Sequence, residues 1–318
     1  MRELLFILLF PTLALAQAYP SKPIKIIIPF APGGASDFVG RIMQPRLSEL
    51  LGQPIVVENR AGASGNIGVE TAAKSAPDGY TLFLGNIGTI AVNPAVFRNL
   101  QMNPLTDLVA VTQVVDVPSV LVAHPGFPAN NVKEMVAHAK ANPGKLNYGS
   151  PGSGSVNRLE MELLRMAEGL DMVHVPYKGG AGPAVAGLMG GETHVMFTTA
   201  ASAIGQVRGG RLKLLAVTSA KRMEQAPATP TMVESGYPDF VTGSWQGVFV
   251  PAGTRSEIVN LLFKNIAQTM STPEVAERLG KGGADVVTSP SPAAFTAFVA
   301  AETKRWARVV HESNATPD

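Results

Sequence analysis

The apolar and polar positions of this chain follow two patterns that alternate from one end to the other. Short apolar runs, such as residues 24–30 and 80–84, are followed by stretches in which apolar residues recur every three or four positions. Runs of the first kind are typical of buried β-strands, and the second spacing places apolar side chains on one face of an α-helix. The alternation therefore predicts an α/β fold.

The same two patterns predict the individual elements. We expect strands at residues 24–30, 55–58, 80–84, 109–122, 146–148, 173–177, 194–197, 212–218 and 245–250. We expect helices at residues 38–51, 69–74, 133–140, 156–170, 256–270, 273–279 and 292–310. Gly52 is suited to end the first helix. Pro45 should kink that helix or shift its start, and Pro118 should break the long strand.

Two long apolar runs indicate how the chain is divided. The chain exceeds what one compact core usually holds, so we expect two lobes. Residues 112–122 and 243–250 are typical of extended crossings between such lobes. We therefore predict one lobe from residues 19–119 together with 244–318, and a second lobe from residues 120–243. The last helices should pack back on the first lobe.

Two strands lead into glycine-rich turns that each precede a helix. The first turn occupies residues 31–37, and the second occupies residues 149–155. The first N–H groups of a helix have no partner inside the helix, and the helix dipole makes that end attractive to anions. Two such turns, more than a hundred residues apart, predict a cleft that holds a small anion from both sides.

The first eighteen residues have the features of a secretory signal peptide. Arg2 supplies a positive charge, residues 4–15 form a short apolar segment, and small residues follow in A-x-A spacing. We expect cleavage after Ala18, with cleavage after Ala16 as the alternative. The apolar segment is too short to span a bilayer, and no cysteine at the junction could carry a lipid anchor. The mature protein is therefore expected to be exported.

Composition excludes several classes of function. Charged residues make up 16% of the chain and the formal net charge is +2, with no basic cluster of the kind that binds nucleic acid. The chain contains no cysteine, which excludes thiol catalysis, cysteine-ligated zinc and iron–sulfur clusters.

The familiar catalytic and cofactor motifs are incomplete. Gly152 and Gly154 match the start of a dinucleotide-binding fingerprint, but Asn157 stands where its third glycine belongs. There is no P-loop, and no serine lies in a G-x-S-x-G turn. The five histidines are scattered, and His174 and His194 are expected to be partly buried structural residues. We therefore expect no catalytic residue, no metal and no cofactor.

Several segments together resemble the Bug family of periplasmic receptors, which serve tripartite tricarboxylate transporters. These segments are PFAPGGASD (29–37), VENRAGASG (57–65), APDGYTL (76–82), YGSPGSGS (148–155), HVPYKGG (174–180) and WQGVFVPAGT (245–254). The resemblance implies a two-lobed periplasmic binding protein fold of type II, with two crossover strands and the ligand cleft between the lobes. Family ligands are mostly small carboxylates.

The resemblance also implies which residues contact the ligand. The two turns that hold one carboxylate correspond here to Ala35, Ser36 and Asp37, and to Ser153, Gly154 and Ser155. Residues at neighbouring strand ends should surround the rest of the ligand: Phe30, Asn86, Thr89, Tyr177, Thr198 and Thr199.

Two charged residues near the turns have more than one interpretation. Asp37 is expected to stabilise the helix dipole as an acidic residue in the first turn. Its backbone N–H is also expected to face the ligand, while its carboxylate either orders the turn or receives an ordered water. Arg158 replaces a histidine that is common in the family. It either meets a second charge on the ligand or faces solvent.

The expected function is that of a monomeric periplasmic receptor. It would capture a small organic carboxylate and deliver it to the membrane subunits of a tripartite tricarboxylate transporter, without catalytic chemistry. One alternative is a sensory receptor that passes the same ligand signal to a signalling partner. A less favoured alternative is a secreted hydrolase or lyase, for which no nucleophile with a partner base can be named.

Overall fold

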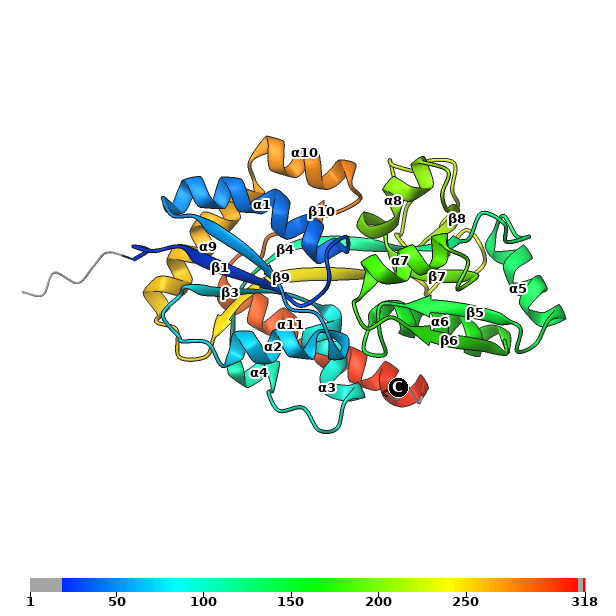
Figure 1. Cartoon of the computed structure of the whole chain (residues 1–318), viewed down its shortest axis with the longest axis horizontal. Helices are drawn as coiled ribbons and strands as arrows, with labels where there is room; N and C mark the ends of the chain where they lie inside the picture. The colour runs from blue at the N-terminus through cyan, green and yellow to red at the C-terminus, as the bar shows by residue number, and fades with distance from the viewer. Residues whose placement is uncertain (1–18, 314–316, 318) are drawn as a thin grey trace, which may run out of the picture.

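The elements gather in two groups joined by two long strands, as a computed structural model shows (Figure 1). The structure describes residues 19–313 and residue 317. Neighbouring strands follow the order β2-β1-β3-β9-β4-β7-β5-β6, and β8 and β10 also pair with β4. We call the group around β1 the first lobe and the group around β5 the second lobe. The lobe boundaries at residues 119/120 and 243/244 stay a prediction.

The first lobe is a sheet covered by helices on both faces. Its strands are β1 (Ile24–Ile28), β2 (Ile55–Asn59), β3 (Thr81–Asn86), β9 (Gly243–Pro251), the first part of β4 (Leu108–Ala123), and β10 (Asp285–Val286). Its helices are α1 (Ala35–Leu51), α2 (Asn66–Ala73), α3 (Asn93–Val96), α4 (Pro104–Asp107), α9 (Ser256–Met270), α10 (Pro273–Lys281) and α11 (Pro292–Ser313). A short 3₁₀ turn, η1 (Ala63–Gly65), and a π-helical turn, η2 (Gly88–Val92), complete it.

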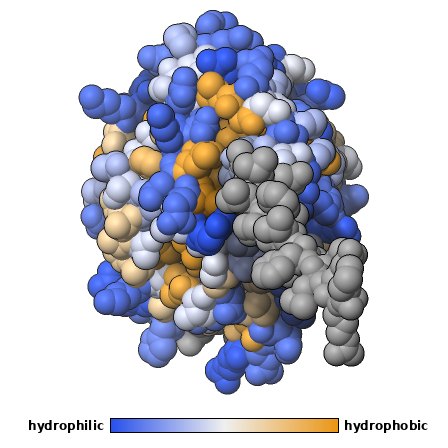
Figure 2. Space-filling model, turned by 90° about the vertical axis from the view of Figure 1, so that its left-hand side faces the viewer, coloured by the Kyte–Doolittle hydropathy of each residue, from blue (hydrophilic) through white to orange (hydrophobic). Residues whose placement is uncertain are grey.

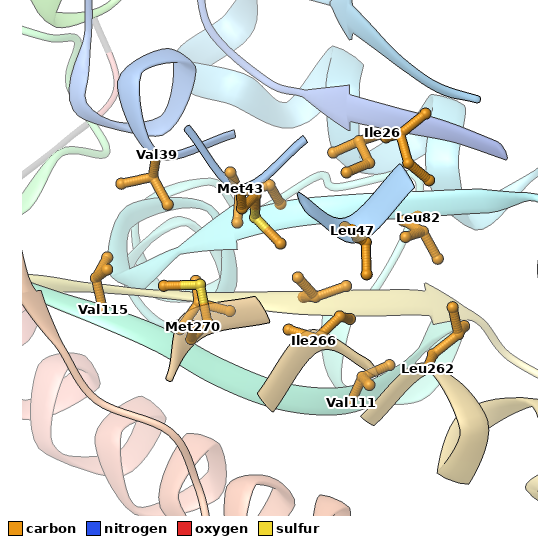
Figure 3. Packing of buried hydrophobic residues seen from close by; sticks show 14 of the residues in the cluster. Ile26, Val39, Met43, Leu47, Leu82, Val111, Val115, Leu262, Ile266 and Met270 are labelled. Atoms are coloured by element: carbon orange, nitrogen blue, oxygen red, sulfur yellow. The ribbon is translucent and has the colours of Figure 1, made fainter. Parts of the chain in front are cut away.

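One apolar core of the first lobe lies between helices α1 and α9 and the sheet. Figure 3 shows Met43 and Leu47 of α1 and Ile266 of α9 pointing toward strand residues such as Val111 and Leu82. A second apolar cluster fills the other face of the sheet, under α2, η2 and α11. Burial on both faces explains why four of the five residues of β1 are isoleucines, with Lys25 as the one polar residue. The end of this lobe that lies away from the second lobe is mostly hydrophilic, with a strip of apolar side chains (Figure 2).

The second lobe repeats the layered arrangement. Its elements are α5 (Val132–Ala141), β5 (Leu146–Ser150), α6 (Val156–Glu168), β6 (Met172–Pro176), α7 (Ala181–Met189), β7 (Val195–Thr199), α8 (Ala200–Arg208) and β8 (Lys213–Val217). β5 pairs in parallel with β6 and β7, and the last residues of β4 pair antiparallel with β7 and β8. Within residues 19–313, no helix combines the length and apolarity needed to cross a membrane.

The long strand β4 is continuous, so the predicted break at Pro118 is wrong. Pro118 is the last residue of β4 that pairs with β9, opposite Gly243, and Ser119 is the first that pairs with β7, opposite Thr199. Proline has no N–H to donate to a ladder. It is therefore tolerated where β4 passes from the sheet of one lobe to the sheet of the other.

Of the two effects predicted for Pro45, the shifted start is wrong, whereas the kink stays a prediction. Helix α1 begins at Ala35 and continues through Pro45 to Leu51, so its start is not shifted. Gly52 ends it as predicted, with a φ of 65° and an N–H that donates to Glu49. Several helical segments were not predicted: the short η1 and α4, η2 with α3, and the longer α7 and α8. Their alanine, glycine and proline residues give little contrast between apolar and polar faces.

Candidate ligand-binding site

A small cavity lies between the two lobes. Its volume is about 40 Å³. It is lined by Phe30, Gly34, Ala35, Ser36, Ser64, Asn86, Gly88, Pro151, Gly154, Ser155, Val156, Asn157, Ala181, Thr199, Ser244 and Gln246. Most of these residues follow the carboxyl ends of β1, β3, β5 and β7, where α/β sheets commonly bind ligands.

Four helices begin at the wall of this cavity. Ala35 and Ala181 start α1 and α7, and Ser155 and Thr199 directly precede α6 and α8. The first main-chain bond of α1 joins Phe38 N to Gly34 O, so the N–H groups of its preceding residues are not used inside the helix. None of the residues described as lining the cavity is charged. An anion here would therefore be stabilised by backbone N–H groups and helix dipoles.

The first turn is held from outside the cavity by Asp37. Its carboxylate accepts hydrogen bonds from Arg41 Nε at 2.9 Å, Asn59 Nδ2 at 3.1 Å and Gly33 N at 3.2 Å. Asn59 Nδ2 also donates to Phe30 O at 2.9 Å. Burial opposes ionisation of Asp37, but these hydrogen bonds outweigh it and hold the pKa of its carboxyl below the ordinary value. The ionised side chain thus orders the turn.

The second turn is held by neutral groups and by an arginine. Ser155 Oγ accepts from Arg158 N at 3.2 Å and caps α6. Ser150 Oγ accepts from Gly152 N at 3.2 Å and lies 2.7 Å from His174 Nε2. Burial lowers the pKa of His174 to about 3, helped by the nearby arginines, so this histidine is neutral. Arg158 Nη1 donates to Ser153 O at 3.3 Å.

Asn157 connects the second turn to β4. Its Nδ2 donates to Ser119 Oγ and to Glu160 Oε2, both at 2.9 Å. Glu160 is fully buried, and burial raises the pKa of its carboxyl to about 7. The side chain of Asn157 is thus fixed at the cavity wall by groups near the point where β4 changes lobes.

The fold has counterparts in known proteins. Residues 39–315 match the model of the tripartite tricarboxylate transporter family receptors, TctC. The chain belongs to this family. It is 39% identical to protein BugT of Bordetella pertussis over 301 residues, which cover 94% of this chain and 92% of BugT. The predicted resemblance is therefore confirmed.

Solved structures of similar proteins agree. MatC of Rhodopseudomonas palustris with bound malate has a TM-score of 0.87 and 32% identity, covering 92% of this chain and 100% of that chain. An R. palustris protein with adipate has a TM-score of 0.91 and 33% identity, covering 94% of this chain and 100% of that chain. The predicted periplasmic binding protein fold is confirmed, and the family is one of solute-binding receptors rather than enzymes.

Seven of the predicted ligand-contacting residues of this receptor line the cavity. They are Phe30, Ala35, Ser36, Asn86, Gly154, Ser155 and Thr199. The structure therefore brings the two turns together with residues from two further strand ends, as the sequence predicts. Their contact with a ligand stays a prediction.

The other predicted residues do not line the cavity. Asp37 and Ser153 belong to the turns, and Thr89 exchanges hydrogen bonds with Asn86. Thr198 is buried in β7 opposite Val120. The Tyr177 hydroxyl donates to Glu192 Oε2 at 2.7 Å, and its ring packs against Gly187 of α7.

Arg158 does not face solvent, so that interpretation is wrong. Only 8% of the residue is exposed, and its guanidinium donates to Ser153 O within the second turn. It is not a lining residue of the cavity either. The contact of Arg158 with a second ligand charge, which the sequence left open, finds no support in this geometry. Arg158 instead helps to hold the second turn.

Nine lining residues were missed by sequence reasoning. They are Gly34, Ser64, Gly88, Pro151, Val156, Asn157, Ala181, Ser244 and Gln246. Gln246 could have been noticed as an amide within the otherwise apolar strand 245–251. Gly34, Pro151, Val156 and Asn157 could have been noticed too, since they lie in the two predicted turns or directly after them. The other four residues reach the cavity because the two lobes meet there, which no local pattern reveals.

The lobes touch through the glycines of the turns. A Cβ on Gly154 would overlap Asn93 Oδ1 and lie 3.0 Å from a ring carbon of Phe97. A Cβ on Gly182, in the first turn of α7, would overlap the carbonyl oxygen of Pro32. Ala31 N donates to Gly179 O at 3.0 Å across the same gap. Each turn therefore lies directly against the opposite lobe, as expected for a closed receptor.

A larger depression lies elsewhere on the first lobe. It has a volume of about 1000 Å³ and is lined mostly by α2, α3, residues 97–104 and the end of α11. It is open and largely apolar, and residues of the second lobe do not contribute to it. The smaller cavity is the better ligand site because both lobes enclose it and helix N-termini converge on it.

Proposed function

We propose that this receptor binds a small organic carboxylate in the cavity between its lobes. The observation that carries the proposal is the convergence of four helix starts on an enclosed site whose described lining has no charged side chain. Such a site favours an anion without requiring an arginine or lysine. The two R. palustris relatives with malate and adipate support a carboxylate as the ligand class.

Ligand capture would work by closure of the lobes. The turns at Ala35 and Ser155 come from different lobes, so a carboxylate between them contacts both only when the lobes are together. The ligand then shifts the receptor toward the closed form by its preference for that form. The lobes are bridged by β4, which pairs in both sheets, and by the chain that returns from the second lobe into β9.

The cellular setting follows from the family and the sequence. We infer that residues 1–18, which lie outside the described residues, are a signal peptide removed near Ala18 on export to the periplasm. The closed receptor acts as a monomer and delivers its ligand to the membrane subunits of a tripartite tricarboxylate transporter. The family of the chain supports this partner.

Thermal unfolding tests the ligand class. The purified mature protein, stripped of any bound ligand, is heated with mono-, di- and tricarboxylates, acidic amino acids and aromatic acids. A ligand at one hundred times its Kd adds about 2.7 kcal/mol of stability and raises Tm by a few degrees. Uncharged amides of the same acids serve as controls. No shift with any acid, or equal shifts with the uncharged controls, would contradict the proposal.

A further inference from the structure

Gln246 is a buried amide at the cavity wall. It lies on β9, is fully buried and lines the cavity. Within the part of the chain that the structure describes, neither its Oε1 nor its Nε2 has a hydrogen-bond partner. Buried polar side chains in native proteins nearly always have partners, so both atoms of this amide retain the capacity to bind a ligand.

The strand sets the direction of Gln246. Alternate residues of β9 point to opposite faces, so Ser244, Gln246 and Val248 share one face. Val248 belongs to the core under α1, whereas Trp245 donates to Glu302 of α11 on the other face. Gln246 therefore lies on the same side of the sheet as the first turn of α1. In the sheet it is paired with Asn86, another lining residue.

The chemistry of a free amide restricts its partner. Nε2 donates and Oε1 accepts, so the complementary group offers an acceptor and a donor close together. A carboxamide does so, and so does a hydroxyl beside a carboxylate. A bare carboxylate satisfies Nε2 but leaves Oε1 facing negative charge. The described lining has no cation to compensate a second carboxylate.

We propose that Gln246 determines specificity by selecting carboxylates that carry a second group with both a donor and an acceptor, a carboxamide or a hydroxyl beside a carboxylate. A second carboxylate alone is disfavoured. This inference rests on the proposed function, because it assumes that the first carboxylate of the ligand lies at the turns and that Gln246 binds the group at the other end.

Calorimetric titration with matched acids tests the inference. The probes are butyrate, succinate, succinamate and malate, together with hexanoate, adipate, adipamate and 2-hydroxyadipate. The first four acids have four-carbon chains and the other four have six-carbon chains. In whichever set binds better, the monoamide or the hydroxy acid should bind wild type about tenfold tighter than the bare diacid and the monoacid. A comparison of the monoamide with the hydroxy acid shows whether the group that donates to Gln246 Oε1 is an amide N–H or a hydroxyl.

Two variants separate recognition from folding. In Gln246→Met, the monoamide or hydroxy acid should bind no more than about threefold tighter than the bare diacid. The Tm without ligand should stay equal or rise, because the substitution removes an unpaired buried amide. Gln113→Met is the matched control, since Gln113 is buried on the adjacent β4, outside the cavity lining, and donates to Val115 O at 3.4 Å. It should keep the wild-type preference. If the methionine variant does not fold, Gln246→Asn shortens the amide and should lose the preference in the same way.

The outcomes distinguish the inference from the proposed function. Tightest binding of succinate or adipate by wild type, or an unchanged preference in Gln246→Met, overturns the role of Gln246 alone. A wild-type protein that binds none of the eight acids, and no other carboxylate in the thermal panel, overturns the carboxylate function and the inference with it.

Discussion

The two glycine-rich turns look alike in sequence but are held in different ways. The first is fixed by the ionised side chain of Asp37, which lies outside the cavity and is bound by Arg41 and Asn59. The second is fixed by the neutral side chains of Ser150 and Ser155 and by the buried Arg158. In both turns, the charged side chain supports the backbone from outside the cavity.

This difference shows how the proposed anion site would be built without a cation in its described lining. The residues that start the helices line the cavity, whereas the side chains of Asp37 and Arg158, which look suited to binding a charge, hold the turns in place. Asp37 and the fully buried Glu160 also respond to pH in opposite directions, because hydrogen bonds lower the pKa of one and burial raises that of the other. The comparison can therefore be tested turn by turn.

The largest effect is expected from a methyl group between the lobes. Gly154→Ala on the second turn and Gly182→Ala opposite the first should each weaken binding about 100-fold, or about 2.7 kcal/mol, because the added Cβ blocks closure. The measurement is ligand affinity by calorimetry, with Tm as a check of folding. Gly205→Ala on α8, where a Cβ meets nothing within 4 Å, is the control and should bind normally. Normal binding by both cavity variants would show that the lobes need not approach this closely.

Glu160→Gln should remove a pH dependence that belongs to the second turn. The pKa of Glu160 is raised to about 7, so the stability it contributes is present below its unfolded pKa of about 4.3 and is lost as pH rises toward 7. The variant should be more stable than wild type at pH 8 by on the order of 2 kcal/mol, and equal to it near pH 4. Urea unfolding across pH measures this. Glu168→Gln, which changes a partly exposed carboxylate at the end of the same helix, should leave the loss of stability between about pH 4 and pH 7 in place. Parallel curves for wild type and Glu160→Gln would contradict the assignment.

Asp37→Asn, on the first turn, should lower stability at neutral pH, which is opposite to the effect of Glu160→Gln on the second turn. Because the pKa of Asp37 is lowered, its contribution to stability is present above about pH 3.9 and is lost as pH falls through the folded value. The variant keeps the shape but loses the charge, so at pH 7 we expect about tenfold weaker binding and a loss of about 1 kcal/mol. Glu49→Gln, an exposed ion-pair partner on the same helix, is the control and should change little. Affinity equal to wild type would mean that the turn does not depend on Asp37.

Ser155→Ala should give the smallest effect. It removes the side chain that caps α6, at a cost of about 1 kcal/mol, while the Arg158 hydrogen bond to Ser153 remains. Binding should weaken by about threefold to tenfold, because the cap helps to hold the second turn, and calorimetry measures this change in affinity. If Ser155→Ala and Asp37→Asn both bind as tightly as wild type, the clamp of two turns is wrong.

Much of the fold could be predicted because its signals are local. The isoleucine-rich strand β1, the glycine turn after it and the Gly52 end of α1 are all set by residues close together in the chain. Ser36 and Ser155 could also be predicted as site residues, because they lie within the glycine-rich turns themselves. Pro118 was misjudged because its effect depends on the strands that pair with β4 on either side of it.

The rest of the site depends on which way side chains point once the lobes meet. Asn157 and Arg158 are neighbours on one helix turn, yet Asn157 lines the cavity while Arg158 is buried outside its lining. Tyr177 turns toward Glu192 rather than the cavity. Gln246 lies 210 residues from Ser36, the difference of their positions in the chain, and reaches the same cavity through the crossover strand. A linear sequence does not display these long-range placements.

A crystal structure of the receptor with its tightest-binding acid from the thermal panel tests the central claim most directly. The account predicts one carboxylate of the ligand between the two turns, within hydrogen-bond distance of the first backbone N–H groups of α1 and α6, with no lysine or arginine side chain in contact. A carboxylate held by a cationic side chain, or a ligand seated in the depression along α3 and α11, would contradict it.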